Sequence, residues 1–212
     1  QRLAREIAAS SAVLLKNKGH LLPLSQDQSI ALIGALAKEP RYQGAGSSFV
    51  TPNRLTSAID GFKANKLQYT YSPGYELNIP TNEALIQEAV ALASKCTIAV
   101  VFAGLPAIIE AEGYDRADMK LPAAQNRLIE QVAQANPNTV VVLNAGAPVE
   151  MPWLPRVKAV LHMHLPGQEG GLAVVDLLTG AANPSGKLAE SYPIRYEDAP
   201  SAGFYEAGGR QA

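Results

Sequence analysis

Apolar residues occur along this chain in two alternating patterns. Short runs, most of them apolar throughout, predict strands at residues 29–34, 67–71, 97–102, 139–143 and 159–165. Between them, apolar residues at helical spacing predict helices at residues 3–15, 51–65, 82–94, 122–135 and 172–178. A last short strand is expected at residues 186–188, and Thr81 is a candidate N-cap for the helix at 82–94.

Strands that alternate with helices over the whole length indicate βαβ units. We therefore expect an α/β fold, a single domain with a mostly parallel sheet and helices on both faces. Residues 1–191 carry this pattern. Residues 192–212 are rich in Pro, Gly and Ala and show no periodicity, so we expect an extended tail there. The pattern does not give the order of the strands.

Composition narrows the classes of function. The 212 residues have a net charge of −1, so the chain lacks the basic surface that binds nucleic acid or anionic membranes. No apolar run reaches the length of a membrane span. The single cysteine, Cys96, excludes an intramolecular disulfide and is expected to be buried and unreactive. Because the chain begins with Gln1, we expect a piece of a longer protein.

Residues 109–116 gather ionisable side chains between a predicted strand and a predicted helix. Charged residues make up 17% of the chain, yet Glu110, Glu112, Asp115 and Arg116 all lie here. Ligands of parallel sheets bind beyond the carboxyl ends of the strands, where this loop is expected. Two carboxylates near a scissile bond are the equipment of glycosidases, but residues two apart in an extended loop point the same way, so a second carboxylate from elsewhere is needed. The alternative is a solvated loop with an Asp115–Arg116 ion pair.

Other motifs carry weaker signals. The glycine-rich residues 44–48 lack the phosphate-loop spacings, which disfavours a nucleotide site and leaves either a close approach to a neutral ligand or a tight turn. His162 and His164 share a predicted strand face without a third ligand placed by sequence, so we expect core or rim histidines and no metal. Trp153 is a sugar-stacking platform or, as we expect, a packing anchor. The turn at 166–171 is an anion site or packs closely through its glycines. No G-x-S-x-G elbow is present, which argues against a serine hydrolase.

A series of sequence blocks resembles glycoside hydrolase family 3, which includes β-glucosidases and related exo-acting enzymes. The central block is residues 110–116, followed by Leu121-Pro122 and Gln125-Asn126. The others are residues 12–17, 21–24, 46–48, 136–143, 147–153, 166–171 and 184–188. Each block alone is weak, but their occurrence in family order across nearly the whole chain is specific.

The resemblance implies the six-stranded α/β sandwich domain of a retaining, exo-acting β-glycosidase, with β-glucosidase as the expected activity. In that family a (β/α)8 barrel supplies the nucleophilic aspartate, and the sandwich supplies the general acid/base glutamate. Glu112 matches that glutamate, and Glu110 is the runner-up. Ser47 matches a position that hydrogen-bonds the sugar, whereas Asp115 and Arg116 are expected to shape the loop through an ion pair.

The same resemblance defines the expected partners. The substrate would be a β-glucoside or oligosaccharide, and no cofactor is implied. The barrel would be the partner domain within the parent chain, so these residues hold half a site and are expected to be inactive alone. In many relatives a further domain follows the region that matches residues 208–210, so the tail at 192–212 would lead into it.

Two rival interpretations remain. One is a non-catalytic carbohydrate-binding or assembly module in which Glu112 is only a polar contact. The other is a flavodoxin-like or nucleotide-binding domain, which fits the fold but lacks a phosphate loop. Within the resembled family, β-glucosidase, β-xylosidase and broader exo-hydrolase activities are not separated, because the sugar pocket lies mostly in the barrel.

Overall fold

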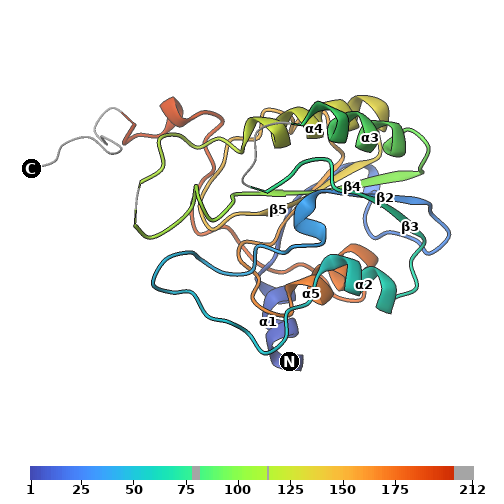
Figure 1. Ribbon diagram of the computed structural model, residues 1–212, viewed down its shortest axis with the longest axis horizontal. Coiled ribbons are helices and arrows are strands. Elements are labelled where there is room, and N and C mark those ends of the chain that lie inside the picture. Colours follow the sequence, from blue (N-terminus) through green and yellow to red (C-terminus); the bar gives the residue numbers. More distant parts are fainter. Residues whose placement is uncertain (78–81, 114, 203–212) are drawn as a thin grey trace, which may run out of the picture.

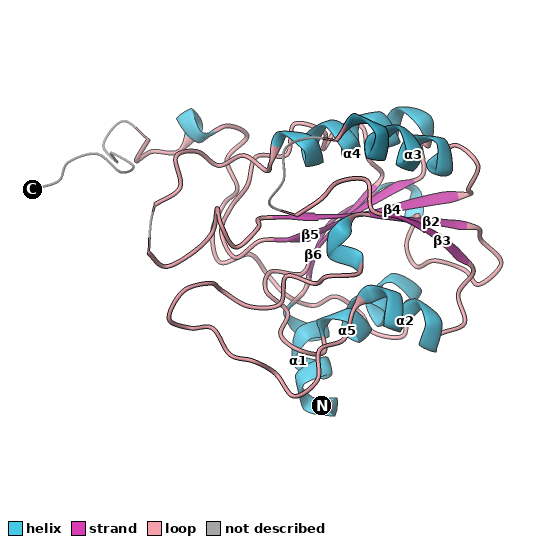
Figure 2. Cartoon of the chain, viewed as in Figure 1, coloured by secondary structure: helices cyan, strands magenta, loops and turns pink. Residues whose placement is uncertain are grey.

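A computed structural model of the chain describes residues 1–77, 82–113 and 115–202. Within these residues a six-stranded sheet lies between two layers of helices (Figures 1 and 2). The strands are β1 (Val13–Asn17), β2 (Ile30–Ile33), β3 (Tyr69–Ser72), β4 (Ile98–Gly104), β5 (Thr139–Asn144) and β6 (Ala159–His162). They pair in the order β1-β6-β5-β4-β2-β3, and every pair is parallel except β1 with β6. The expected α/β sandwich with a mostly parallel sheet is confirmed.

Helices cover both faces of this sheet. The α-helices of the described residues are α1 (Arg2–Ser11), α2 (Ala58–Ala64), α3 (Glu83–Ala93), α4 (Ala123–Ala135) and α5 (Gly170–Thr179). Helices α3 and α4 lie on one face, and α1, α2 and α5 lie on the other (Figure 1). Short 3-10 helices η1 (Lys18–His20), η2 (Ala35–Ala37) and η3 (Tyr196–Asp198) lie in the connections. None of the helices in the described part of the chain is long and apolar enough to cross a membrane.

The four inner strands, β2, β4, β5 and β6, are buried along their whole length. The edge strands β1 and β3 are only partly buried. This difference explains the sequence pattern, because a strand covered by helices on both faces is apolar throughout, whereas an edge strand can alternate. The apolar runs therefore located the centre of the sheet correctly.

The helix predicted at residues 3–15 is too long, and its last three residues, 13–15, belong to a strand. Helix α1 ends at Ser11, and Ala12 is extended, with φ −66° and ψ 143°. The chain then forms β1, whose residues pair antiparallel with β6. Three consecutive apolar residues beginning at Val13 fit helical spacing and a buried strand equally well, and the free edge of β6 decides between them.

Other elements also differ from the prediction, and the strand predicted at 159–165 ends at His162. Helix α2 begins at Ala58 and not near residue 51, because a capping box between Ser57 and Asp60 starts it. Residues 186–188 form no strand; Gly186 only donates one backbone hydrogen bond to Ala12. The sixth strand is therefore β1. Thr81 lies outside the described residues, and the N-cap of α3 is Asn82, whose side chain accepts from the Ala84 amide.

Four connections meet at one edge of the sheet, because β2, β4, β5 and β6 are parallel and their carboxyl ends share that edge. These connections are residues 34–57, 105–122, 145–158 and 163–169, and the first two are the long loops on the left of Figure 1. Backbone hydrogen bonds join them, from Glu112 to Ala45, from Gly167 to Tyr42 and from Glu150 to Met119. The predicted acidic loop is one of the four.

Candidate active site

Glu112 and Ser47 come together at this edge. Glu112 lies in the connection after β4, and Ser47 lies in the glycine-rich connection after β2, 65 residues away in sequence. The Ser47 amide donates to Glu112 Oε2 over 3.1 Å, and the Ser47 hydroxyl donates to the same oxygen. Both residues are exposed. The structure thus holds an acidic side chain in a defined orientation while leaving it accessible from outside.

Gly46 makes this close approach feasible. Its φ is +97°, a conformation that residues with a side chain rarely adopt. A Cβ at this position would stand 3.1 Å from Glu112 Cβ. A tight turn alone does not explain this contact. The glycine-rich residues 44–48 bring their backbone against the side chain of Glu112.

Glu110 has different surroundings. Its side chain is 15% exposed, and its two carboxylate oxygens accept the amides of Gly146 over 3.1 Å and Ala147 over 2.8 Å. Arg41 Nη2 lies 3.6 Å from Glu110 Oε2 and donates to the Glu110 carbonyl oxygen over 2.8 Å. The Glu110 carboxylate is therefore turned into the protein, whereas the Glu112 carboxylate faces outward.

Sequence reasoning missed Arg41. The residue is 9% exposed, although a charged side chain is almost never buried without a partner. Its partner, Glu110, is 69 residues further along the chain. A single arginine in a loop gives no signal of such a partner, because the pairing depends on how two connections meet at the sheet edge.

Asp115 and Arg116 do not form the expected ion pair. Asp115 is exposed, and Arg116 donates through Nη1 to the Pro148 carbonyl oxygen over 3.0 Å. Arg116 Nε and Nη2 are buried and have no hydrogen-bond partner. Burial lowers the pKa of Arg116, while the nearby carboxylates of Glu110 and Asp118 oppose that shift. Arg116 ties its loop to the connection after β5 and not to its neighbour in sequence.

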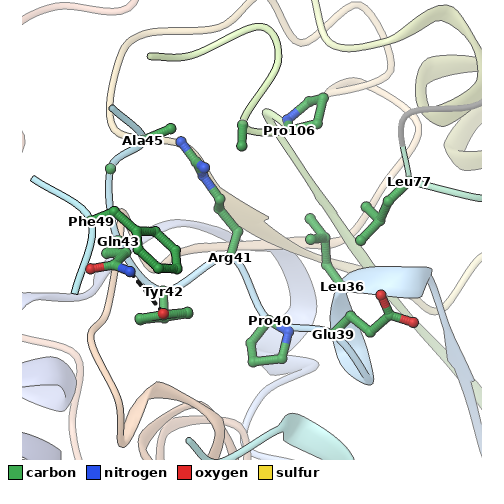
Figure 3. Close-up of a pocket in the computed structure, with 12 residues that line it drawn as sticks. Leu36, Glu39, Pro40, Arg41, Tyr42, Gln43, Ala45, Phe49, Leu77 and Pro106 are labelled. Carbon is green, nitrogen blue, oxygen red and sulfur yellow. Dashed lines mark hydrogen bonds between the residues drawn. The ribbon is translucent and has the colours of Figure 1, made fainter. Parts of the chain in front are cut away.

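Arg41 and Glu110 each line a hollow beside these loops. The first, of about 210 Å³, is shown in Figure 3, where the Arg41 side chain extends towards Ala45 and Pro106. Phe49, which is 63% exposed, lies at the same hollow. The second, of about 310 Å³, is lined by Glu110, Ala111, Asp115, Arg116, Asp118, Met119 and Tyr196. Residues of the acidic loop thus line the second hollow, and Asp115 and Arg116 also line a further one of about 440 Å³.

The sequence predicted core or rim histidines: His162, the last residue of β6, lies in the core, whereas His164 lies beyond the strand, is partly exposed and has a φ of +52°. His162 is fully buried; its Nδ1 lies 3.2 Å from the Leu143 carbonyl oxygen and its Nε2 lies 2.7 Å from the Tyr192 hydroxyl. Burial, with a smaller effect from His164, lowers the pKa of His162 to about 4. Among the residues described, no group of three His, Cys, Asp or Glu side chains could hold a metal ion.

Three smaller expectations are resolved by packing. Trp153 is fully buried and donates to Asn126 Oδ1 over 2.9 Å, so it is an anchor and not a sugar platform. The glycines of the 166–171 turn allow close packing, since a Cβ on Gly171 would lie 2.3 Å from the Ser57 backbone. The prediction that Cys96 is buried is wrong, because its side chain is partly exposed. The partial burial that it has raises the pKa of its thiol.

The fold and the site together define the class of this protein. It is an α/β sandwich in which loops at the carboxyl edge of a parallel sheet present an outward-facing carboxylate, held by a serine from a glycine-rich loop. The model of the glycosyl hydrolase family 3 C-terminal domain matches residues 12–211. The chain belongs to this family.

Curated relatives and solved structures agree with that membership. The chain is 52% identical to thermostable β-glucosidase B of Acetivibrio thermocellus, over 94% of this chain and 27% of that protein. It is 41% identical to an exo-α-(1→6)-L-arabinopyranosidase of Bifidobacterium longum, over 94% of this chain and 28% of that protein. The family 3 β-glucosidase structure of Bifidobacterium adolescentis superposes with a TM-score of 0.90 and 40% identity, over 94% of this chain and 30% of that one. The chain therefore spans less than a third of these proteins.

Proposed function

We propose that this domain supplies Glu112 as the general acid/base of a retaining, exo-acting β-glycosidase. The single observation that carries the proposal is the contrast at the acidic loop. Glu112 presents an accessible carboxylate oriented by Ser47, while both oxygens of Glu110 are taken by backbone amides. A proton donor must reach the glycosidic oxygen, and Glu112 has that access.

The chemistry then follows in two steps. The Glu112 carboxyl protonates the leaving oxygen while an aspartate from a (β/α)8 barrel elsewhere in the parent chain attacks the anomeric carbon. Glu112, now ionised, takes a proton from the water that hydrolyses the glycosyl-enzyme intermediate. Retention needs the two carboxyls about 5–5.5 Å apart, so Glu112 has to reach across a domain boundary. Its exposed position supports this arrangement.

A β-glucoside or β-linked oligosaccharide is the proposed substrate. The relative with 52% identity is a β-glucosidase, and a solved relative, β-glucosidase 3B of Thermotoga neapolitana, was crystallised with glucose and matches with a TM-score of 0.81 and 31% identity. An arabinopyranosidase at 41% identity indicates that close relatives of this domain serve different sugars. Sugar choice would then rest with the barrel, and acid/base catalysis with this domain.

Ser47, Asp115 and Arg116 would have supporting roles. Ser47 orients Glu112 before substrate binds, and its hydroxyl would turn to the sugar once the site is occupied. Arg116 fixes the loop through the Pro148 carbonyl oxygen, with Asp115 at the exposed side of the same turn. The tail after residue 191 would lead to a further domain; its described part packs back through Tyr192 onto His162 and through the Tyr196 amide onto Glu150.

The test compares Glu112→Ala with Glu110→Ala in the full-length parent enzyme. Each variant is assayed on aryl β-glucosides with a good and with a poor leaving group, with and without azide. We expect Glu112→Ala to lose about 10²–10⁴-fold on the poor leaving group, which needs a proton, and to lose less on the good one. Azide should restore turnover of the substrate with the good leaving group, since it replaces the water that Glu112 activates in the second step and fits the space that the carboxylate leaves.

The control is Glu110→Ala, in which azide should restore nothing because the Glu112 carboxylate is still present. Azide rescue of Glu110→Ala instead would move the acid/base role to Glu110. If neither variant distinguishes the two leaving groups, the loop is not catalytic. Binding of glucosides by this domain alone at micromolar concentration would then favour a carbohydrate-binding module.

A further inference from the structure

We propose that Arg41 and Glu110 form a positioning pair that fixes the Glu112 loop for proton transfer. The pair touches neither substrate nor reacting atoms in the proposed mechanism; it acts through Glu112, and it therefore rests on the proposed function. Arg41 lies outside the sequence blocks that carry the family resemblance.

The pair joins three of the four connections at the sheet edge. Arg41 comes from the connection after β2 and Glu110 from the connection after β4, and Arg41 Nη2 reaches both the carbonyl and the carboxylate of Glu110, at 2.8 and 3.6 Å. The carboxylate in turn accepts the amides of Gly146 and Ala147, which follow β5. One buried ion pair thus holds loops that begin on three neighbouring strands.

The two segments that carry the site run side by side from this pair. Arg41 contacts Glu110, the Ala45 carbonyl oxygen accepts the Glu112 amide over 3.3 Å, and Ser47 donates to the Glu112 carboxylate. Residues 41–47 therefore lie alongside residues 110–112, with one contact at each end and one between them. Without the contact between Arg41 and Glu110, the start of both segments is free to move. The contact between Ser47 and the Glu112 carboxylate, at the other end of the segments, is then displaced.

Burial makes this geometry specific. The Arg41 and Glu110 side chains are 9% and 15% exposed, and removing one partner of such a pair leaves an uncompensated charge inside the protein. Loss of Glu110 would leave Arg41 in that state, whereas loss of Arg41 would leave Glu110 with its two backbone amides and remove the link to the connection after β2. In either case the loop would be free to move, and a displacement of about 1 Å at a catalytic group can cost about 100-fold in rate. The expected defect is therefore in proton donation and not in sugar binding.

The experiment measures leaving-group dependence in the full-length parent enzyme. In Arg41→Gln and Glu110→Gln, we expect the ratio of kcat/KM between a good and a poor aryl leaving group to rise about tenfold or more, with KM for the good substrate little changed. Arg41→Lys keeps the charge without the guanidinium geometry and should fall between wild type and Arg41→Gln. This conservative variant also serves if Arg41→Gln does not fold.

Arg5→Gln is the matched control. Arg5 makes a two-pronged, partly buried ion pair with Asp176 between α1 and α5, on a helical layer and outside the loops at the site. Its removal should lower thermal stability and leave the leaving-group ratio unchanged. If Arg41→Gln behaves in the same way as Arg5→Gln, the pair is structural only and the inference is wrong.

A double variant separates this inference from the proposed function. When Glu112→Ala already raises the ratio, adding Arg41→Gln should raise it no further, since the acid to be positioned is gone. A further rise equal to that of Arg41→Gln alone would contradict the positioning role while leaving Glu112 as the acid/base. An unchanged ratio in Glu112→Ala itself would overturn both.

Discussion

Glu110 and Glu112 are two residues apart, and the protein gives their carboxylates opposite surroundings. The first accepts two backbone amides and faces a buried arginine, and the second is exposed and accepts from a serine on a neighbouring loop. In an extended loop both side chains would leave on the same side. The backbone between them turns, so one carboxylate anchors the loop and the other is left free for chemistry.

One prediction at the residue scale concerns His162 and the dependence of stability on pH. Burial holds its pKa near 4, below the 6.5 of an unperturbed histidine. Between these two values the unfolded chain binds a proton that the folded chain does not, so stability is complete above about pH 6.5 and falls as the pH drops towards 4. The loss should be at most about 3 kcal/mol, measured as the free energy of unfolding in urea.

His162→Gln should reduce the slope of this part of the pH profile, because it removes one of two histidines whose pKa burial lowers; His164, whose pKa burial also lowers, keeps its own contribution. His20→Asn provides the control: His20 is exposed and has a positive φ, which asparagine tolerates. Its replacement should leave the slope between pH 6.5 and 4 unchanged. A slope in His162→Gln equal to that of wild type would show that other groups cause the pH dependence.

At the scale of elements, glycines decide how closely α2 and α5 pack. A Cβ on Gly61 would lie 2.6 Å from the Gly171 carbonyl oxygen, and a Cβ on Gly171 would lie 2.3 Å from the Ser57 backbone. Both neighbours are backbone atoms, which cannot rotate away as a side chain can. The packing of helices therefore explains the glycine at position 171 of the turn at residues 166–171, whereas Gly167 has a positive φ of 73° and no close neighbour.

We expect Gly171→Ala to destabilise the domain by about 1–3 kcal/mol or more, because α5 must move away from the start of α2. Chemical denaturation monitored by circular dichroism would show a lower midpoint with an unchanged slope. Gly113→Ala is the comparison, since a Cβ there meets nothing within 4 Å; it should stay within about 0.5 kcal/mol of wild type. Equal stability of the two variants would contradict the close packing of α2 and α5.

At the scale of the whole molecule, the domain holds its acidic residue at an exposed edge. The chain covers 27–30% of the length of the relatives compared above. Large apolar side chains are exposed near the site as well, among them Phe49, Val50 and Ile108. This arrangement fits a site completed by another part of the parent enzyme.

The isolated chain should therefore not hydrolyse aryl β-glucosides at a rate above background, although it carries Glu112. In the proposed mechanism the nucleophile belongs to the barrel, so no glycosyl-enzyme intermediate would form on this chain alone and most of the rate enhancement would be lost. The full-length parent enzyme, assayed at the same molar concentration, is the positive control. Turnover by the chain alone that disappears in Glu112→Ala would contradict this prediction and require a second carboxylate within these residues.

The sequence by itself determined the fold class and most of the elements, and it marked the acidic loop in which the proposed site lies. The apolar runs marked β2, β4, β5 and β6 because helices cover both faces of the inner strands, and that burial demands apolar residues at every position. The density of charge in residues 109–116 marked the acidic loop, since charged side chains are scarce elsewhere. Both signals come from residues that are neighbours in the chain, so they can be recognised from the sequence alone.

Only the tertiary structure decided how these parts meet. Residues 13–17 became an edge strand because the edge of β6 was free to pair with them. Ser47 reached Glu112, and Arg41 reached Glu110, across 65 and 69 residues, because parallel strands bring the connections after them to one edge. A contact between residues so far apart depends on the order of the strands, which hydrophobic periodicity does not record.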